Sequence, residues 1–208
     1  MFSKGLSPDA ARNLALLAQI PQVKKFYLAG GSALALHFAH RYSFDLDFFS
    51  PAKFDSKQLR NRLQELGKFS LDQIAEDTLL GKLNQTKISF FTYRYSLLFP
   101  PKSFSGVKIA SILDIACMKL DAISARGTKR DFIDLYFICQ KEKLLKIFKL
   151  FEKKYQKADY NLAFIQKSLV YFVDAEKDEM PRMIKEVSWG EVKRFFEKEV
   201  IRSGKKYL

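Results

Sequence analysis

The 208-residue chain has only two cysteines, Cys117 and Cys139, and it has no apolar run of the roughly 18 residues that a membrane span needs. A disulfide scaffold and a transmembrane protein are therefore excluded. The first residues lack the apolar segment and small-residue cleavage site of a secretory leader. These absences predict a cytoplasmic protein that does not enter a membrane and whose thiols are reduced and buried in helices.

Acidic residues are also scarce relative to basic ones. Lys and Arg total 36 against 23 Asp and Glu, which gives a formal charge of +13. Such an excess favours an anionic partner such as a nucleic-acid backbone or a polyphosphate. A basic protein without such a partner is an equally good interpretation of the charge alone.

The pattern of apolar residues predicts an α+β fold. Short strands are expected at 25–29 and 44–49, a helix at 56–66, and a meander of strands at 70–76, 79–84 and 87–93. The proline pair at 100–101 begins a predicted loop that ends at Gly106. We therefore expect a core with a small mixed sheet at 1–106 and a C-terminal helical bundle at 107–208. The helices of this bundle are expected at 111–126, 128–140, 142–157, 160–172 and 189–201.

Two motifs in the first half carry chemistry. Gly30, Gly31 and Ser32 follow a predicted strand and begin a helix, which is a turn whose amides can hold phosphate oxygens. Asp45 and Asp47 share one face of the next strand and could bind Mg²⁺, which prefers oxygen ligands. Each motif alone is weak, but together they predict a metal-dependent site for a nucleoside triphosphate.

A third candidate is Lys119, which lies on the apolar stripe of the helix at 111–126. A lysine on such a stripe needs a partner, either a bound triphosphate or a nearby carboxylate, unless its stem reaches out to water. Asp131 and Asp134 begin the next helix, and Asp131 could also form a capping box with Thr128.

These segments resemble the AbiEii/AbiGii toxin family of nucleotidyltransferases, in the polymerase-beta-like superfamily. The resemblance rests on AGGSALALHFAHRYSFDLDFFS (29–50) and LDIACMKLDAISARGTKRDFIDLYFI (113–138), with weaker support from VSWGEVKRFFEKEV (187–200). It implies transfer of a nucleotidyl group from an NTP with Mg²⁺ or Mn²⁺ as cofactor. In some members the acceptor is the 3′ end of tRNA, and a separate antitoxin controls the toxin.

The resemblance also implies roles for single residues. Asp45 and Asp47 would be catalytic and bind the metal, while Lys119, Asp131 and Asp134 would be catalytic. The nucleotide would be bound by Gly30, Gly31, Ser32, Arg41, Ser43 and Lys119.

The chain departs from the superfamily in one respect, because a third carboxylate is expected on a later strand and residues 78–113 contain no Asp or Glu. Ser89 stands where that acid would be sought. The base that accepts the proton must then be Asp131, Asp134 or a metal-bound hydroxide, or else there is none. The absence favours an alternative function, a degenerate nucleotidyltransferase fold that only binds nucleotide, RNA or protein.

Overall fold

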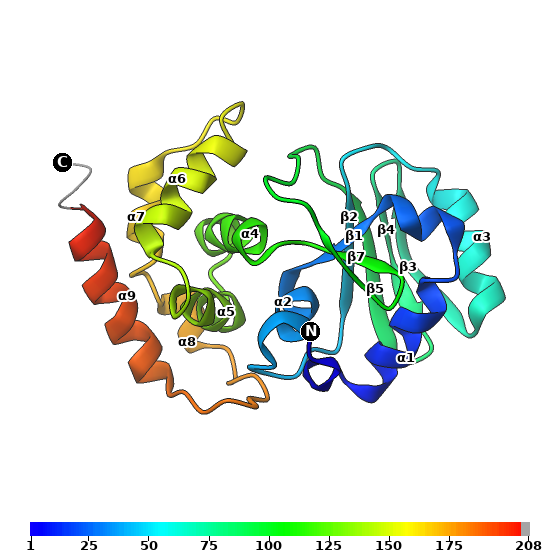
Figure 1. The fold of residues 1–208 in the computed structure, drawn as a ribbon, viewed down its shortest axis with the longest axis horizontal. Helices are drawn as coiled ribbons and strands as arrows, with labels where there is room; N and C mark the ends of the chain where they lie inside the picture. Colours follow the sequence, from blue (N-terminus) through cyan, green and yellow to red (C-terminus); the bar gives the residue numbers. More distant parts are fainter. Residues whose placement is uncertain (205–208) are drawn as a thin grey trace. The chain divides into compact units, whose positions relative to one another are not determined.

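The computed structural model describes residues 1–204, and these divide into two compact units, residues 1–111 and residues 112 onward. Figure 1 shows the helices and strands of both units. The first unit contains a mixed sheet and the second is helical, so the predicted α+β class is confirmed. No helix in the described part of the chain is long and apolar enough to cross a bilayer.

The sheet of the first unit has seven strands in the order β3-β4-β5-β2-β1-β7-β6. Its central strands β1 (Tyr27–Ala29) and β2 (Leu46–Ser50) are antiparallel, and β2 pairs in parallel with β5 (Thr86–Thr92). The outer strands are β3 (Phe69–Ala75), β4 (Thr78–Leu83), β6 (Lys102–Phe104) and β7 (Val107–Ile109). The meander β3-β4-β5 follows the sequence prediction closely. Buried positions alternate along β4 and β5, whereas β3 is mostly exposed.

Three helices pack on this sheet. α1 (Pro8–Leu17) begins at Ser7, whose hydroxyl accepts a hydrogen bond from the Ala10 amide. α3 (Ser56–Leu66) packs against β3 and β4, while α2 (Gly30–Phe38) packs against β1 and β2, on the other side of the sheet in Figure 1. The stacked rings of Phe48 and Phe90, 4.9 Å apart, join β2 to β5 inside the core.

Three sequence predictions for the first unit need correction. The strand expected at 25–29 begins only at Tyr27, because Pro21 begins a 3-10 helix, η2 (Pro21–Lys25). The strand expected at 44–49 runs from Leu46 to Ser50, so Asp45 lies just before it. Part of the loop expected at 100–106 is the hairpin of β6 and β7, which extends the sheet beyond residue 106.

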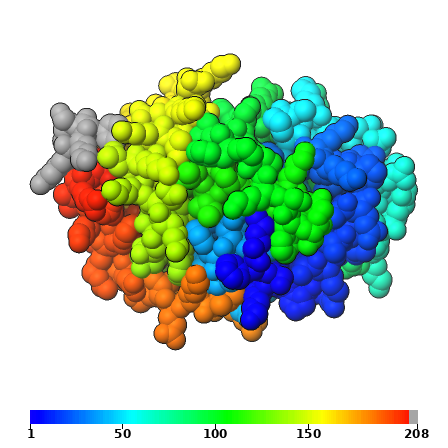
Figure 2. Space-filling view, viewed as in Figure 1, coloured from blue at the N-terminus to red at the C-terminus, as the bar shows by residue number. Residues whose placement is uncertain are grey.

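The second unit begins with α4 (Ile112–Ala125) and α5 (Lys129–Cys139), followed by α6 (Leu144–Lys154). The helix expected at 160–172 is two shorter helices, α7 (Leu162–Ser168) and α8 (Val173–Glu176), and α9 (Trp189–Gly204) follows. Figure 2 shows one face of the surface that the side chains of the two units form, coloured along the sequence. Both cysteines are free as predicted, although Cys117 is buried and Cys139 only half-buried. Burial raises the pKa of the Cys117 thiol to about 12.

Candidate active site

The start of α2 lies beside the carboxylate of Asp47. Ala29, the last residue of β1, is opposite Asp47 in the antiparallel pair, so the helix begins at the level of this acid. Gly30 has a φ of +64°, a conformation that side-chain-bearing residues rarely adopt. A Cβ at Gly30 would lie 3.4 Å from Oδ2 of Asp47. The glycine therefore permits both the sharp strand-to-helix turn and the close approach of the carboxylate.

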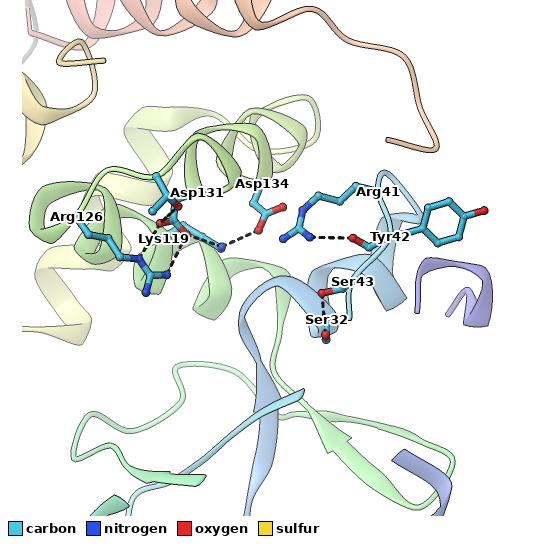
Figure 3. Close-up of polar contacts among 9 residues, drawn as sticks. Ser32, Arg41, Tyr42, Ser43, Lys119, Arg126, Asp131 and Asp134 are labelled. Carbon is cyan, nitrogen blue, oxygen red and sulfur yellow. Dashed lines mark hydrogen bonds and ion pairs between the residues drawn. The ribbon is translucent and has the colours of Figure 1, made fainter. Parts of the chain in front are cut away.

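Ser32 ties this turn to the segment that precedes β2. Its hydroxyl lies 2.9 Å from the hydroxyl of Ser43 (Figure 3). It also donates a hydrogen bond to the carbonyl oxygen of Asp45. Ser32 is 2% exposed and Ser43 is 7% exposed. The Ser32 hydroxyl thus ties the backbone of Asp45 to the first turn of α2, and the Ser43 hydroxyl lies against that of Ser32.

Arg41 lies against the second glycine of the turn. Its side chain is buried, and Nη1 donates a hydrogen bond to the carbonyl of Tyr42 at 3.1 Å (Figure 3). A Cβ at Gly31 would overlap the terminal nitrogen Nη2 of Arg41. The absent side chain at Gly31 therefore lets a guanidinium lie directly over the start of the helix, where donors for a phosphate are useful.

The side-chain oxygens in this region are of the kind that bind a hard divalent cation. Asp47 is half-buried on β2 between the fully buried Leu46 and Phe48, so it is on the face of the strand away from the core. Asp45 is also half-buried and lies just before the strand. In the parallel pair, Ser89 of β5 is opposite Asp47. Two carboxylates and a hydroxyl are oxygen ligands of the kind that Mg²⁺ and Mn²⁺ prefer. No cluster of three or more His, Cys, Asp or Glu that could hold a metal occurs within residues 1–204.

The second unit contains a separate cluster of buried charges. Lys119 of α4 is 6% exposed, and its Nζ lies 2.8 Å from Oδ1 of Asp131 and 2.6 Å from Oδ2 of Asp134, both on α5 (Figure 3). The interpretation in which the Lys119 stem reaches water is therefore wrong. The sequence left open whether Lys119 pairs with a bound triphosphate or with a nearby carboxylate. In this structure it pairs with two carboxylates.

Asp131 collects three donors at the α4–α5 junction. Besides Lys119, it accepts hydrogen bonds from Arg126 Nε at 3.0 Å and from the Thr128 hydroxyl at 2.7 Å. The predicted capping box is wrong, because the Thr128 hydroxyl makes no cap and donates to the carboxylate. Burial by itself raises the pKa of Asp131, but Lys119 and then Arg126 outweigh it and lower the pKa to about 2.

Sequence reasoning missed a second buried ion pair in this unit. Lys154 of α6 lies 2.9 Å from Oδ1 of Asp114 on α4, and both side chains are fully buried. Lys154 follows Ile147 and Phe151 on the buried side of α6. The rule that singled out Lys119, a lysine on an apolar stripe, could therefore have found it.

The sequence matches a known protein family over most of its length. The family model described as nucleotidyl transferase AbiEii toxin of type IV toxin–antitoxin systems matches residues 14–109 and 96–200. The chain belongs to this family. An uncharacterized protein of Aquifex aeolicus (strain VF5) is 43% identical over an alignment of 189 residues that covers 88% of each of the two chains.

Two solved structures share the fold of this AbiEii family member. JHP933 of Helicobacter pylori superposes with a TM-score of 0.58 at 18% identity, over 97% of this chain and 96% of its own. The nucleotidyltransferase toxin MenT4 of Mycobacterium tuberculosis has a TM-score of 0.59 at 15% identity, over 96% of this chain and 86% of its own. At these identities the likeness establishes the fold, and the family match establishes membership among nucleotidyltransferase toxins of type IV systems.

Proposed function

We propose that this AbiEii family member transfers a nucleotidyl group from an NTP to an RNA acceptor. The observation that carries the proposal is the carboxylate of Asp47 beside the glycine start of α2. A site that binds a divalent cation and a triphosphate together needs anionic ligands next to backbone amides. This part of the first unit offers both within a few residues.

The chain's own residues would divide the work of binding. Asp45 and Asp47 would hold Mg²⁺ or Mn²⁺, which when bound would offset the charge of the phosphate oxygens. The amides of Gly31 and Ser32 would bind phosphate oxygens, and the Arg41 guanidinium would add charged donors. Ser32 and Ser43 would keep Asp45 in position through their hydroxyls.

The reaction itself is a substitution at the α-phosphorus. The acceptor hydroxyl oxygen forms a bond to that phosphorus, the bond to the bridging oxygen breaks, and pyrophosphate leaves with the electron pair. The hydroxyl proton passes to a carboxylate or to water. Asp131, with a pKa near 2, is a weak base, so we assign it to holding Lys119 and Arg126. Asp134 is the acid that we propose for testing as the base.

The family suggests the partners. We propose the 3′ end of tRNA as the acceptor and a separate antitoxin protein as the regulator, both on the strength of family membership and of the +13 charge. A catalytic part for Lys119 and Asp134 is proposed on the strength of family membership alone.

One observation favours a second candidate function. Ser89 is opposite Asp47 on the neighbouring strand, the position in which a third carboxylate would stand beside the pair. Without that acid the chain could bind a nucleotide, RNA or a protein and catalyse nothing. This binding-module function predicts nucleotide affinity with no transfer.

The deciding experiment incubates the purified chain with each α-labelled NTP, Mg²⁺ and total RNA. Transfer is supported if the wild-type chain labels RNA and this labelling depends on Asp47. The Asp47→Asn variant should reduce the rate of RNA labelling by about two orders of magnitude or more. Ser70→Ala, a change at an exposed position of β3, is the matched control and should label RNA as fast as the wild-type chain does. Nucleotide binding without labelled RNA at any NTP would establish the binding module instead.

A further inference from the structure

The second unit has a cavity of about 350 Å³ between the end of α4 and one face of α7. This cavity, named here the α4–α7 pocket, is within the size range of small-molecule sites. One wall is the last turn of α4 and the two residues after it, including Ser124 and Arg126. The other wall comes from α7 and the residues that follow it, as far as Asp174. The pocket uses none of the residues assigned above to metal or triphosphate binding.

Two aromatic rings face this pocket. Phe164, Lys167, Ser168 and Tyr171 are three, four and seven residues apart, so they share one side of α7 and its continuation. Phe164 is 56% exposed and Tyr171 is 57% exposed. Within the described residues 1–204, neither ring makes a contact with another aromatic ring. The core side of α7 is formed by other residues, so these rings are not needed for its packing.

The buried side of α7 consists of Ile165 and, just after the helix, Leu169, which are 4% and 0% exposed. Each of them is next in sequence to a pocket-lining residue, but neither lines the pocket. Changes to Phe164 or Tyr171 should therefore leave the core of the unit intact.

Cations flank the rings. Lys167 is exposed and forms no ion pair within the described part of the chain. Arg126 is anchored to Asp131 through Nε, yet 65% of its side chain is exposed. The acid that lines the pocket, Asp174, lies 3.2 Å from Lys177, which offsets its charge. The pocket thus combines stacking surfaces with positive charge.

We infer that the α4–α7 pocket binds a nucleotide of single-stranded RNA, with its base on Phe164 and Tyr171 and its phosphate near Lys167 and Arg126. Aromatic platforms bordered by basic side chains are how proteins hold single strands. The inference rests on the proposed function for the identity of the nucleic acid, and it adds where part of the acceptor is bound.

A free triphosphate suits this pocket less well than an RNA strand. The wall at Ser124 and Ala125 is the C-terminal turn of α4, whose last carbonyl oxygens are the negative end of the helix. Carbonyl oxygens repel a highly charged triphosphate, but they accept hydrogen bonds from base amino groups and from ribose hydroxyls.

The test measures binding of a short fluorescent single-stranded RNA by anisotropy, in EDTA so that no transfer takes place. Phe164→Ala and Tyr171→Ala should each weaken binding about tenfold. Lys167→Glu should weaken it and lower the slope of log affinity against log salt by about one. Matched controls are Phe2→Ala, an aromatic of similar exposure in the first unit, and Lys153→Glu, an exposed lysine of α6. Neither control should change the affinity by more than about twofold.

Parallel titrations with free NTP and with RNA show which of the two ligands the pocket binds. If the pocket variants weaken binding of free NTP and leave RNA binding unchanged, the pocket binds the NTP and the inference is wrong. If they change neither affinity, the inference is also wrong, and a protein partner becomes the better candidate for this surface. Unchanged melting temperatures of the variants would show that the effects are local.

The outcome does not depend on whether the chain is an enzyme. Loss of RNA affinity in the pocket variants supports the inference even if no RNA is ever labelled. Conversely, labelling that needs Asp47 but ignores Phe164 and Tyr171 would support the proposed function and overturn the pocket assignment.

Discussion

Gly30 and Gly31, at the start of α2, are each needed for a reason beyond the strand-to-helix turn itself. Gly30 adopts a left-handed conformation beside Asp47, and Gly31 leaves room for Arg41. These two glycines are therefore needed for different reasons, one for backbone conformation and one for a side chain from another segment.

Gly31→Ala should separate folding from function. The added methyl group overlaps only the far end of the flexible Arg41 side chain, so the free energy of unfolding should change by less than about 1 kcal/mol. The guanidinium must move away from the helix start, so NTP affinity should fall about tenfold. Calorimetric titration with NTP and thermal melting would check this. An alanine variant with wild-type NTP affinity would show that Arg41 has no part in binding.

Ser89→Asp should add the carboxylate that the chain lacks. The residue is half-buried and opposite Asp47, so an aspartate there would bring a third acid to the same face of the sheet. We expect about tenfold tighter Mn²⁺ binding, measured by titration calorimetry, because added carboxylates strengthen a site for hard cations. Thr92→Asp, a half-buried change further along β5, is the control. Equal Mn²⁺ affinity of Ser89→Asp and wild type would argue against a metal at Asp45 and Asp47.

At the scale of elements, buried ion pairs join the helices of the second unit. Lys119 links α4 to α5, and Lys154 links α6 to α4. Removing one member of a buried pair leaves the other charge without compensation, which costs more than the pair itself contributes. Lys119 is therefore structural whatever its catalytic part.

Lys119→Met should destabilise the protein by about 3–5 kcal/mol, because it leaves Asp131 and Asp134 buried without their shared cation. Lys167→Met, an exposed change on α7, should stay within about 0.5 kcal/mol of wild type. Urea unfolding of the two variants measures the difference. Equal stability would mean that the two acids are protonated or find other donors, and the cluster would then not be structural.

Asp131 should also make stability depend on pH. Its pKa is lowered to about 2 in the folded chain, from about 4 when unfolded, so its contribution is fully present above pH 4. That contribution, about 2 kcal/mol, is lost as the pH falls from 4 to 2. Unfolding curves of wild type and Asp131→Asn at several pH values should therefore converge towards pH 2. A difference between them that is constant from pH 7 to pH 2 would contradict the ion-pair account.

At the scale of the whole molecule, ligand binding should be visible as a gain in stability. A ligand that binds only the folded chain raises its melting temperature by mass action. We expect Mg²⁺ with a non-hydrolysable NTP analogue to raise the melting temperature by several degrees, at a concentration about 100 times the dissociation constant. Asp47→Asn should abolish this rise, and the exposed Ser70→Ala should retain it. A rise of equal size in both variants would place the ligand away from Asp47.

Several features were predictable from local patterns. The strands β4 and β5 and the helix α3 follow from period-two and three-to-four spacing, since these patterns report which face of an element is buried. The short strand β1 and the hairpin at β6 and β7 were poorly predicted. They are three residues long each and exist because of their neighbours in the sheet.

By itself the sequence determined the fold class, the position of the glycine turn, the place of Asp47 on a strand, and the need of Lys119 for a partner. These follow from residue type and periodicity, which act over a few residues. Only the tertiary structure decided that Asp47 lies against Gly30, that Ser89 is opposite it, and that Arg41 covers Gly31. It also decided that Asp131 receives Lys119 and Arg126 in place of a helix cap. The physical reason is that strand register and helix packing bring together groups whose chemistry no local pattern relates.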